Sequence, residues 1–572
     1  MKALDISPSL GGEKDFMNDY VTVTLNGFLL NAGVIGLIKM FDFARLQFDD
    51  AGCTEGVDYE IDGQSLHISR DFLLSRNLAD LYVRSMVYYM GDDTKFSKVM
   101  NRKSQLDKLY EEVNTDDKGW VKKADEIFKE FVEMLSKASF KSGYEILSKY
   151  EDVTSPTSDM VTNLKKAGDY MLKKELYDEL HLLLEQEKVK EVLIFKELMY
   201  SKINLFMEGV SFFEKSKSRN DITQCYRDSF VEPLIDELKT TKKNEKRCID
   251  CGELASKTLS MSFLVDVTDD VNRKKSYYWN CNPDAFLCPL CNFVYSFAPL
   301  GFHYLAGDAV FVNNNSSIDL LNSWVSRLDD NEGDSEKNPW FKVYNVFTSE
   351  KTKDLHNRIN NVQVVIRDNR FRKYILNNID KNVVGILDDC KPHLDYIKSR
   401  YVKDGEDYIN VYQEAVEHVV KRRSLYGLIS RLIRISLKDG TDPDCAFSLV
   451  QIEIRSGGGE KMAEKNKRAY VATRFGKEMR QAMTVNVPDK DKDNKLRGLV
   501  YQLLNAASLG NRDEFIHLVL RTYSGCGRPV PDIFLGCFDS NESFKEIAFA
   551  YILGLKSDPR ETEEDKKGAN AQ

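Results

Sequence analysis

Four cysteines near the middle of the chain carry the most specific chemical pattern in the sequence. Cys248 and Cys251 belong to a CIDC tetrapeptide, and Cys288 and Cys291 belong to a CPLC tetrapeptide. Each pair can hold two thiolates on one tight turn, and two pairs complete the tetrahedral sulfur shell that structural Zn2+ prefers. The pattern therefore predicts a zinc site made by all four cysteines. Unrelated buried thiols and a redox CxxC motif are the alternatives.

The segment between the two cysteine pairs is longer than the roughly 15–20 residues of an ordinary zinc ribbon. It contains RKKSYYWN, in which three cations precede three aromatic residues. The three cations are Arg273, Lys274 and Lys275. Cations beside aromatic rings suit single-stranded nucleic acid, whereas a hairpin with solvated lysines is the plainer interpretation. Cys281 also lies here and could replace one of the four ligands.

An apolar run from Phe293 to Val312 approaches the length of a membrane span, but Pro299 and Asp308 interrupt it. We therefore expect a core helix and strand and no contact with a membrane. His303 is expected to be a core histidine, because four sulfurs already close a structural zinc site. The run ends in three short amides, which form either a plain turn or a loop that reads base edges. These amides are Asn313, Asn314 and Asn315.

Length and composition indicate a soluble globular protein. The 572 residues suffice for three or four domains, and 42% of them are hydrophobic and 30% charged. Residues 1–16 lack the apolar core of a signal peptide, so we expect a cytoplasmic protein. The net charge of -9 argues against nonspecific coating of nucleic acid.

Known catalytic patterns are missing from the sequence. It contains no GxxxxGK, GxSxG or HExxH motif, and its seven histidines are scattered. We therefore expect a protein that is not an enzyme.

The periodicity of apolar residues predicts an α+β protein that is predominantly helical, with a mixed N-terminal domain, a zinc-binding module and a C-terminal helical bundle. Alternation predicts a strand over 19–25 and a hairpin over 57–68, and a helix is expected over 69–90. The expected regions are 1–100 (N-terminal α+β), 101–245 (helical), 246–385 (zinc-binding and mixed α/β), 386–557 (C-terminal helical bundle) and 558–572 (disordered tail).

Two further basic tracts are candidate nucleic-acid surfaces. The first follows strands predicted over 341–347 and 362–366 and contains Arg370, Arg372 and Lys373. The second lies on a C-terminal helix and contains Lys467, Arg474 and Lys477. Arg474, Lys477 and Gln481 share one helical face, which suits phosphates, although a solvated charged face would look the same.

Three motifs together resemble one known family. They are the paired CxxC motifs, NAGVIG at 31–36, and KLRGLVYQLLNAASLGNRDEF at 495–515 followed by PVPDIFL at 529–535. NAGVIG alone indicates a cap at Asn31 and a glycine-bearing helix start, which could hold an anion or could let a helix and a strand pack closely. As an ordered set, the motifs resemble the large subunit of the type I-B CRISPR Cascade effector complex, in its paired-CxxC subfamily. Because they fall at the beginning, middle and end, the resemblance covers the whole chain.

The resemblance implies a non-catalytic role in antiviral defence. Such a subunit contacts the 5′ end of the guide CRISPR RNA and recognises the protospacer-adjacent motif (PAM) on target double-stranded DNA. It also supports R-loop formation and presents the displaced strand to a helicase–nuclease. The implied partners include the backbone, 5′-handle-binding and small subunits. The C-terminal part, especially 462–557, resembles the small subunit.

The glycine-rich segment SGGGEKM at 456–462 has two interpretations. Its codons could place a ribosome-binding sequence just before an ATG, which predicts an internal start at Met462 and a separate small subunit spanning 462–572. A flexible glycine linker is the alternative.

Two other classes of protein are alternatives for the function of this chain. A stand-alone zinc-ribbon regulatory or RNA-processing factor would bind nucleic acid tightly by itself, with a steep salt dependence. A helical regulatory protein would use zinc only to hold its fold together.

Overall fold

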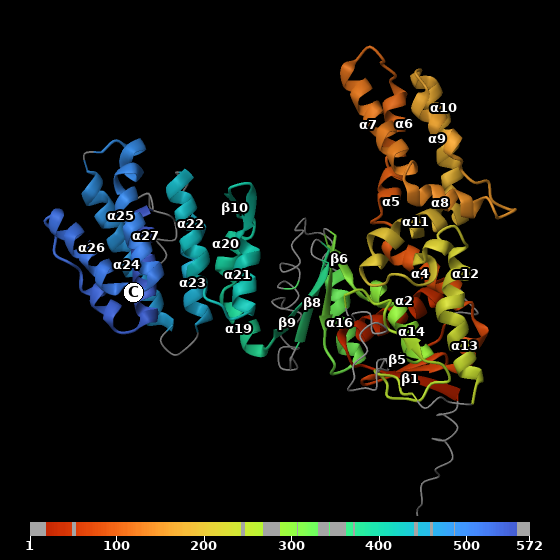
Figure 1. Ribbon diagram of the computed structural model, residues 1–572. Helices are drawn as coiled ribbons and strands as arrows, with labels where there is room; N and C mark the ends of the chain where they lie inside the picture. Colours follow the sequence, from red (N-terminus) through yellow and green to blue (C-terminus); the bar gives the residue numbers. More distant parts are fainter. Residues whose placement is uncertain are drawn as a thin grey trace, which may run out of the picture. The chain divides into compact units, whose positions relative to one another are not determined.

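The computed structural model describes residues 19–47, 53–241, 246–266, 286–305, 307–329, 343, 362–369, 372–439, 444–457, 462–485 and 487–556 (Figure 1). The fold is α+β and mostly helical, as predicted. The chain divides into two compact units, Met1–Pro339 with Gln363–Leu376 and Trp340–Val362 with Asn377–Gln572. Several predictions fall outside the described residues: those for Arg273, Lys274, Lys275, Cys281, Arg370, segment 458–461, the tail at 558–572, and the strand at 341–347 except for Val343, which is helical.

The first unit begins with a small antiparallel sheet in the order β1-β3-β2. Its strands are β1 (Tyr20–Thr24), β2 (Tyr59–Asp62) and β3 (Ser65–Ser69). Val23 pairs with Leu66 in the register, and both are buried. Gly63 turns the β2–β3 hairpin with a φ of +58°, a conformation that glycine adopts without steric cost. The predicted first strand and hairpin are confirmed.

Helix α2 (Phe28–Gln47) follows β1 and starts earlier than the sequence suggested. We expected Asn31 to cap this helix, but Asn31 lies within its first turns and is fully buried. The helix predicted over 69–90 is divided into α3 (Arg70–Ser75) and α4 (Leu78–Met90). The break occurs because Asn77 caps α4, its side-chain oxygen accepting from the Asp80 backbone N–H at 3.4 Å.

A helical region follows, as the periodicity predicted. Its elements are α5 (Lys95–Met100), α6 (Lys103–Glu111), α7 (Lys118–Leu135), α8 (Ala138–Leu147), α9 (Ser158–Lys166), α10 (Tyr170–Glu185), α11 (Glu187–Ser201), η1 (Ile203–Leu205), η2 (Ser211–Phe213), η3 (Lys215–Lys217), α12 (Ile222–Tyr226), η4 (Arg227–Val231) and α13 (Glu232–Lys239). The pattern is readable because apolar residues recur at helical spacing on each segment.

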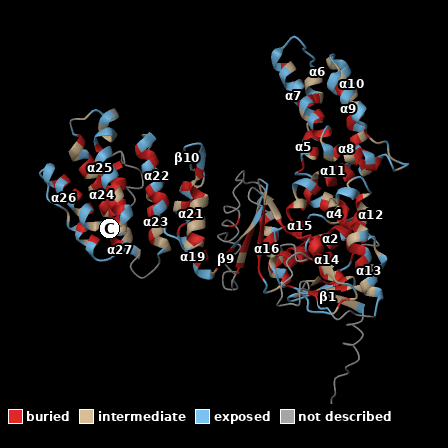
Figure 2. Cartoon of the chain, in the orientation of Figure 1, coloured by how far each residue is buried: buried red, intermediate tan, exposed pale blue. Residues whose placement is uncertain are grey.

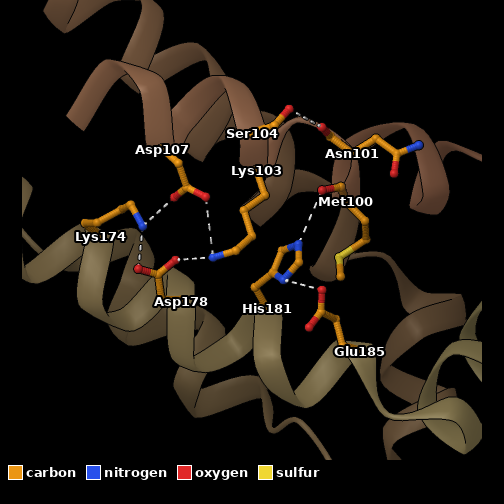
Figure 3. Close-up of polar contacts among 9 residues, drawn as sticks. All are labelled: Met100, Asn101, Lys103, Ser104, Asp107, Lys174, Asp178, His181 and Glu185. Carbon is orange, nitrogen blue, oxygen red and sulfur yellow. Dashed lines mark hydrogen bonds and ion pairs between the residues drawn. The ribbon is translucent and has the colours of Figure 1, made fainter. Parts of the chain in front are cut away.

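Helices α6 and α10 are joined by a network of alternating charges (Figure 3). Lys103 lies 2.9 Å from Asp178, and Lys174 lies 2.9 Å from Asp107. One turn further along α10, His181 contacts the Met100 carbonyl oxygen at 3.3 Å. Burial lowers the pKa of His181, so the ring is neutral near pH 7.

The apolar run after the second cysteine pair forms core elements, as expected. They are α14 (Pro289–Ser296), α15 (Ala298–Gly301), β6 (His303–Leu305) and β7 (Asp308–Asn313). Two short strands, β4 (Leu259–Ser260) and β5 (Phe286–Leu287), precede the run, and α16 (Ile318–Asp329), β8 (Val362–Asp368) and β9 (Lys373–Ile379) follow it. Strands β6 to β9 form one sheet in that order. Among the described residues, none of the helices combines the length and apolar character that crossing a membrane requires.

The second unit consists mainly of helices. Its elements are α19 (Lys381–Asp389), α20 (Lys391–Ile397), β10 (Tyr401–Asp404), β11 (Asp407–Asn410), α21 (Val411–Val420), α22 (Tyr426–Asp439), α23 (Asp444–Ser456), α24 (Met462–Thr484), α25 (Asp489–Leu509), α26 (Arg512–Gly525), η7 (Asp532–Phe538) and α27 (Asn541–Lys556). The expectation of helices alone was wrong at β10 and β11, which form an antiparallel hairpin around Gly405.

Each unit has its own buried core (Figure 2). In the first unit, α2 is buried along most of its length, and α14 and α15 pack against it. In the second unit, α24 and α27 cross at Gly476 and Gly554, where a Cβ atom on Gly554 would lie 2.1 Å from the Thr473 carbonyl oxygen. Such spacing is possible only because both residues lack a side chain.

Candidate metal centre

The first cysteine pair lies on a tight loop in the first unit. Arg247 and Leu254 form an antiparallel bridge that closes this loop. Within it the Cys248 N–H donates to the Glu253 carbonyl oxygen at 2.9 Å. Gly252 has a φ of +72°, which lets the chain reverse directly after Cys251. The loop therefore brings both thiols of this pair to one side.

The second cysteine pair lies at the start of helix α14. Cys288 is the N-cap residue of α14, and its sulfur accepts from the Cys291 backbone N–H at 3.3 Å. Pro289 occupies the first helical position, where its missing N–H costs nothing. The two pairs are held together by the ladder between β4 and β5 and by the Ile249 N–H, which donates to the Phe286 carbonyl oxygen at 2.8 Å.

All four cysteine sulfurs lie within 4.8 Å of one another. The Cys251 and Cys288 sulfurs are 3.7 Å apart, too far for a disulfide. Metal–sulfur bonds of about 2.3 Å in a tetrahedron place the sulfurs about 3.8 Å apart, so the spacing fits a shared ion. Cys248, Cys288 and Cys291 are buried, and Cys251 is exposed. The four thiols could hold a metal ion, and their chemistry is consistent with zinc.

The four adjacent thiols shift one another's pKa values in opposite directions. Hydrogen bonds from neighbouring thiols lower the pKa of Cys248, while hydrogen bonding to Cys248 raises the pKa of Cys288 and of Cys291. The pKa of Cys251 is also lowered, because the opposing effect of Cys248 is outweighed by the hydrogen bonds to Cys288 and Cys291 together. Two of the four thiols therefore lose their protons more readily than usual, and two less readily. A divalent cation would compensate the charge of further thiolates.

Helix α2 supports the second cysteine pair through glycine contacts. A Cβ atom on Gly33 would lie 2.3 Å from the Val294 carbonyl oxygen, and one on Gly36 would lie 2.2 Å from that of Phe297. From the opposite side, a Cβ atom on Gly301 would lie 2.0 Å from the Ala32 carbonyl oxygen. NAGVIG is therefore a close-packing surface, but its partners are helices α14 and α15, whereas we expected a strand.

Two of the three asparagines at the end of β7, Asn313 and Asn315, bond to α2 or to its preceding turn. The Asn31 side-chain N–H donates to the side-chain oxygens of Asn313 at 2.7 Å and Asn315 at 2.6 Å. The Asn315 side-chain N–H donates to the Asn26 carbonyl oxygen at 2.8 Å. The Asn26 side-chain N–H in turn donates to the Asp250 carbonyl oxygen at 3.4 Å.

These bonds place the asparagine loop beside the first cysteine pair. Asn313 and Asn314 are buried, whereas Asn315 and Ser316 are exposed. Recognition of base edges by these asparagines stays a prediction. Asn315 is the one of the three whose side chain is exposed.

The described members of the first basic tract lie at the turn between β8 and β9. Arg372 has a φ of +51°, and its guanidinium lies 3.6 Å from the Glu208 carboxylate. Lys373 is exposed at the start of β9. His303 lies on β6, opposite Val310, and does not belong to the cysteine group.

The cations of the second basic tract lie on two faces of helix α24, an inner face packed against α27 and an outer face exposed to solvent. Lys465 pairs with Glu542 of α27 at 2.7 Å, so it belongs to the inner face. Lys467 and Arg474 are exposed, and Arg474 lies 3.5 Å from Glu478. Lys477 is half-buried. Phosphate binding by the three predicted residues stays a prediction.

Comparison with known families adds one finding. The four cysteines lie in a segment that matches a known family, whereas helix α2 lies outside it. Residues 241–303 match a family of CRISPR-associated proteins. The family is described as CRISPR-associated protein (Cas_CXXC_CXXC), and the match includes both cysteine pairs. It supports a CRISPR-associated protein. Comparisons with curated proteins and with solved structures gave no match.

Two features near the predicted sites escaped the sequence analysis. Asn31 was predicted as a cap, and no local pattern indicates that it bonds to residues 282 and 284 positions away. The β10–β11 hairpin did have a signal, because Asp404-Gly405 between alternating residues is typical of a hairpin turn.

Proposed function

We propose that this CRISPR-associated chain is the non-catalytic large subunit of a type I-B Cascade surveillance complex. The observation that supports this most strongly is the convergence of four cysteine sulfurs within the segment that matches the CRISPR-associated family. In this proposal the four cysteines hold a structural Zn2+, which fixes the loop of the first pair to helix α14. The protein contacts the guide RNA 5′ end and recruits the helicase–nuclease.

The asparagine loop is proposed to take part in recognition of the PAM. Asn26 links Asn315 to the loop that carries Cys248 and Cys251, so the metal centre would hold Asn315 in a fixed position. The Asn315 oxygen accepts from Asn31 and one of its side-chain N–H groups donates to Asn26, which leaves a second N–H that can donate to an acceptor on a base edge. Guide pairing would read the rest of the target.

The exposed cations of α24 are proposed to track the phosphates of an unwound strand and so to support R-loop formation. Lys467 and Arg474 extend into solvent from one helix. Contacts of this kind supply affinity without sequence preference and weaken as the salt concentration rises.

Co-purification tests the proposed assembly. The chain is expressed with its gene neighbours and a guide RNA, and the product is analysed by size exclusion, RNA content and zinc content. We expect a large RNA-containing complex with about one zinc per copy of this chain. If the chain elutes alone and free of RNA, the proposal is wrong, and a stand-alone zinc-ribbon nucleic-acid-binding protein becomes the better interpretation.

Motif recognition is tested in the assembled complex with the variant Asn315→Ala. We expect weaker binding to target duplex that carries the adjacent motif and unchanged binding to duplex without it, because only base contacts depend on sequence. Asn220→Ala is the control, since Asn220 is an exposed asparagine outside the loop. Equal loss on both duplexes would contradict a reading role, and thermal melting of each variant shows whether the fold is intact.

A further inference from the structure

The β10–β11 hairpin has two chemically different faces. Ile409 is buried and Val402 is half-buried, so one face packs against the unit. Residues alternate along a strand, and Lys403 lies opposite Tyr408 in the register. The outer face therefore consists of Tyr401, Lys403, Tyr408 and Asn410.

The two tyrosines of this outer face are unusually exposed for aromatic side chains. Tyr401 is 55% exposed and Tyr408 is 67% exposed. The Asn410 amide donates to the Tyr401 hydroxyl at 3.2 Å, which restricts one ring on the strand surface. Tyr401 and Tyr408 are diagonal neighbours across the ladder, and such residues lie about 7–8 Å apart. Two exposed rings on one face of the hairpin therefore offer surfaces on which bases of a single strand can stack.

Cations accompany these aromatic rings. Arg400 precedes β10, and its guanidinium lies 5.4 Å from the centre of the Tyr396 ring, itself 45% exposed. Lys403 is exposed between the two tyrosines of the outer face. The phosphates of a strand whose bases stack on Tyr401 and Tyr408 would therefore meet positive charge.

The acidic residues of the hairpin lie toward its tip. Asp404 is neutralised by Arg431 of α22, whose Nη2 atom lies 2.6 Å from its carboxylate. Glu406 and Asp407 flank the turn and are exposed. The favourable path for a polyanion therefore crosses the Tyr401 end of the hairpin and avoids the tip.

We propose that the outer face of the β10–β11 hairpin binds single-stranded nucleic acid. Tyr401 and Tyr408 stack on bases, while Arg400 and Lys403 contact phosphates. A protein partner is less favoured, because the outer face has no aliphatic side chain and lysine is depleted from the cores of protein interfaces. The proposal depends only on these residues and stands whether or not the chain belongs to Cascade.

The test measures fluorescence anisotropy of labelled oligonucleotides with the purified full chain. The probes are a thymidine 20-mer, a uridine 20-mer and a duplex of equal length. We expect Tyr401→Ala combined with Tyr408→Ala to weaken single-strand binding by at least about fivefold for each ring removed. The double phenylalanine variant should bind like the wild type, because stacking needs the ring and not the hydroxyl. Tyr200→Ala is the control, since Tyr200 is 50% exposed in the other unit.

Several outcomes would overturn the proposal. Unchanged single-strand affinity in the double alanine variant would do so, as would equal affinity for the duplex, whose bases are already stacked. Loss of a co-purifying protein subunit with intact single-strand binding would show that the hairpin docks protein instead. Comparison of the thymidine and uridine probes identifies DNA or RNA as the preferred strand, and melting curves confirm that each variant is folded.

Discussion

Gly33 of helix α2 lies against the backbone of Val294 in helix α14, so closely that a Cβ atom on Gly33 would be 2.3 Å from the Val294 carbonyl oxygen. Val294 lies three residues after Cys291 on the same helix. The position of α14, and with it the position of two cysteine sulfurs, therefore depends on the absence of a side chain at residue 33. This contact joins the N-terminal motif to the metal centre.

The variant Gly33→Ala is expected to lower the free energy of unfolding by about 1–3 kcal/mol, because a methyl group there must push two backbones apart. Displacement of α14 should also lower metal affinity. Chemical denaturation and competition with a zinc chelator measure the two effects. Gly385→Ala is the control, since a Cβ atom there meets nothing within 4 Å and the change should be neutral or slightly stabilising. Equal behaviour of the two variants would contradict the close-packing role.

The variant Cys288→Ser is expected to abolish stoichiometric zinc binding. It removes a thiolate from the metal shell but leaves an N-cap at the start of α14, because a serine hydroxyl can accept from the Cys291 backbone N–H as the sulfur does. Metal analysis of the purified chain should fall from about one zinc to well below that value.

Cys225→Ser provides the matched control for this prediction. Cys225 is also buried in the first unit, but it does not belong to the group of four. Zinc content should stay unchanged in the control, even if replacing a buried thiol lowers stability. Retention of full zinc by Cys288→Ser would show that the metal uses other ligands.

Local patterns in the sequence were sufficient to predict that the two cysteine pairs converge and that the first strand forms. Each CxxC pair places its two sulfurs together by the geometry of one turn, so their convergence needs only that two turns meet. Alternation over 20–24 likewise determines β1, because one face must be buried. The sequence also identified the apolar run after Cys291 as core, since proline and charge interrupt it.

Long-range polar contacts could not be predicted in the same way. Asn31 reads as a helix cap because asparagine favours that position, yet burial of α2 against α14 and α15 draws it into the helix. Its amide is satisfied by Asn313 and Asn315, and no local period relates residues so far apart in sequence. The role of Asn313 as a buried partner follows only from the tertiary structure.

Stability in acid is expected to depend on His393 of helix α20. Burial, together with a smaller effect of the nearby Arg455 charge, lowers the pKa of His393 to about 4. The unfolded chain takes up this proton near pH 6.5, so it binds more protons than the folded chain between pH 6.5 and 4. The stabilisation is therefore complete above pH 6.5 and is lost as the pH falls toward 4.

His393→Gln should remove about 2 kcal/mol of this pH dependence, a value reduced for partial solvent exposure. Urea denaturation between pH 4 and 7 measures it as a difference in slope from the wild type. His517→Gln is the control, because His517 is exposed in the same unit. Parallel curves for His393→Gln and the wild type would show that His393 does not carry the effect.

An internal start at Met462 gives the last prediction. Helix α24 begins at Met462, so a chain that starts there would keep α24 whole, together with α25, α26 and α27. The crossing of α24 and α27 at Gly476 and Gly554 lies inside this fragment, which would retain that backbone contact.

Expression of the gene with a C-terminal tag should therefore give a short second product beginning at Met462. Silent recoding of Gly457 to Gly459 should remove this product and leave the full chain unchanged, because it alters only the messenger. Silent recoding of Gly476 is the control and should leave both products. A short product that survives recoding of Gly457 to Gly459 would instead indicate proteolysis in the segment before α24, which the glycine-linker interpretation predicts.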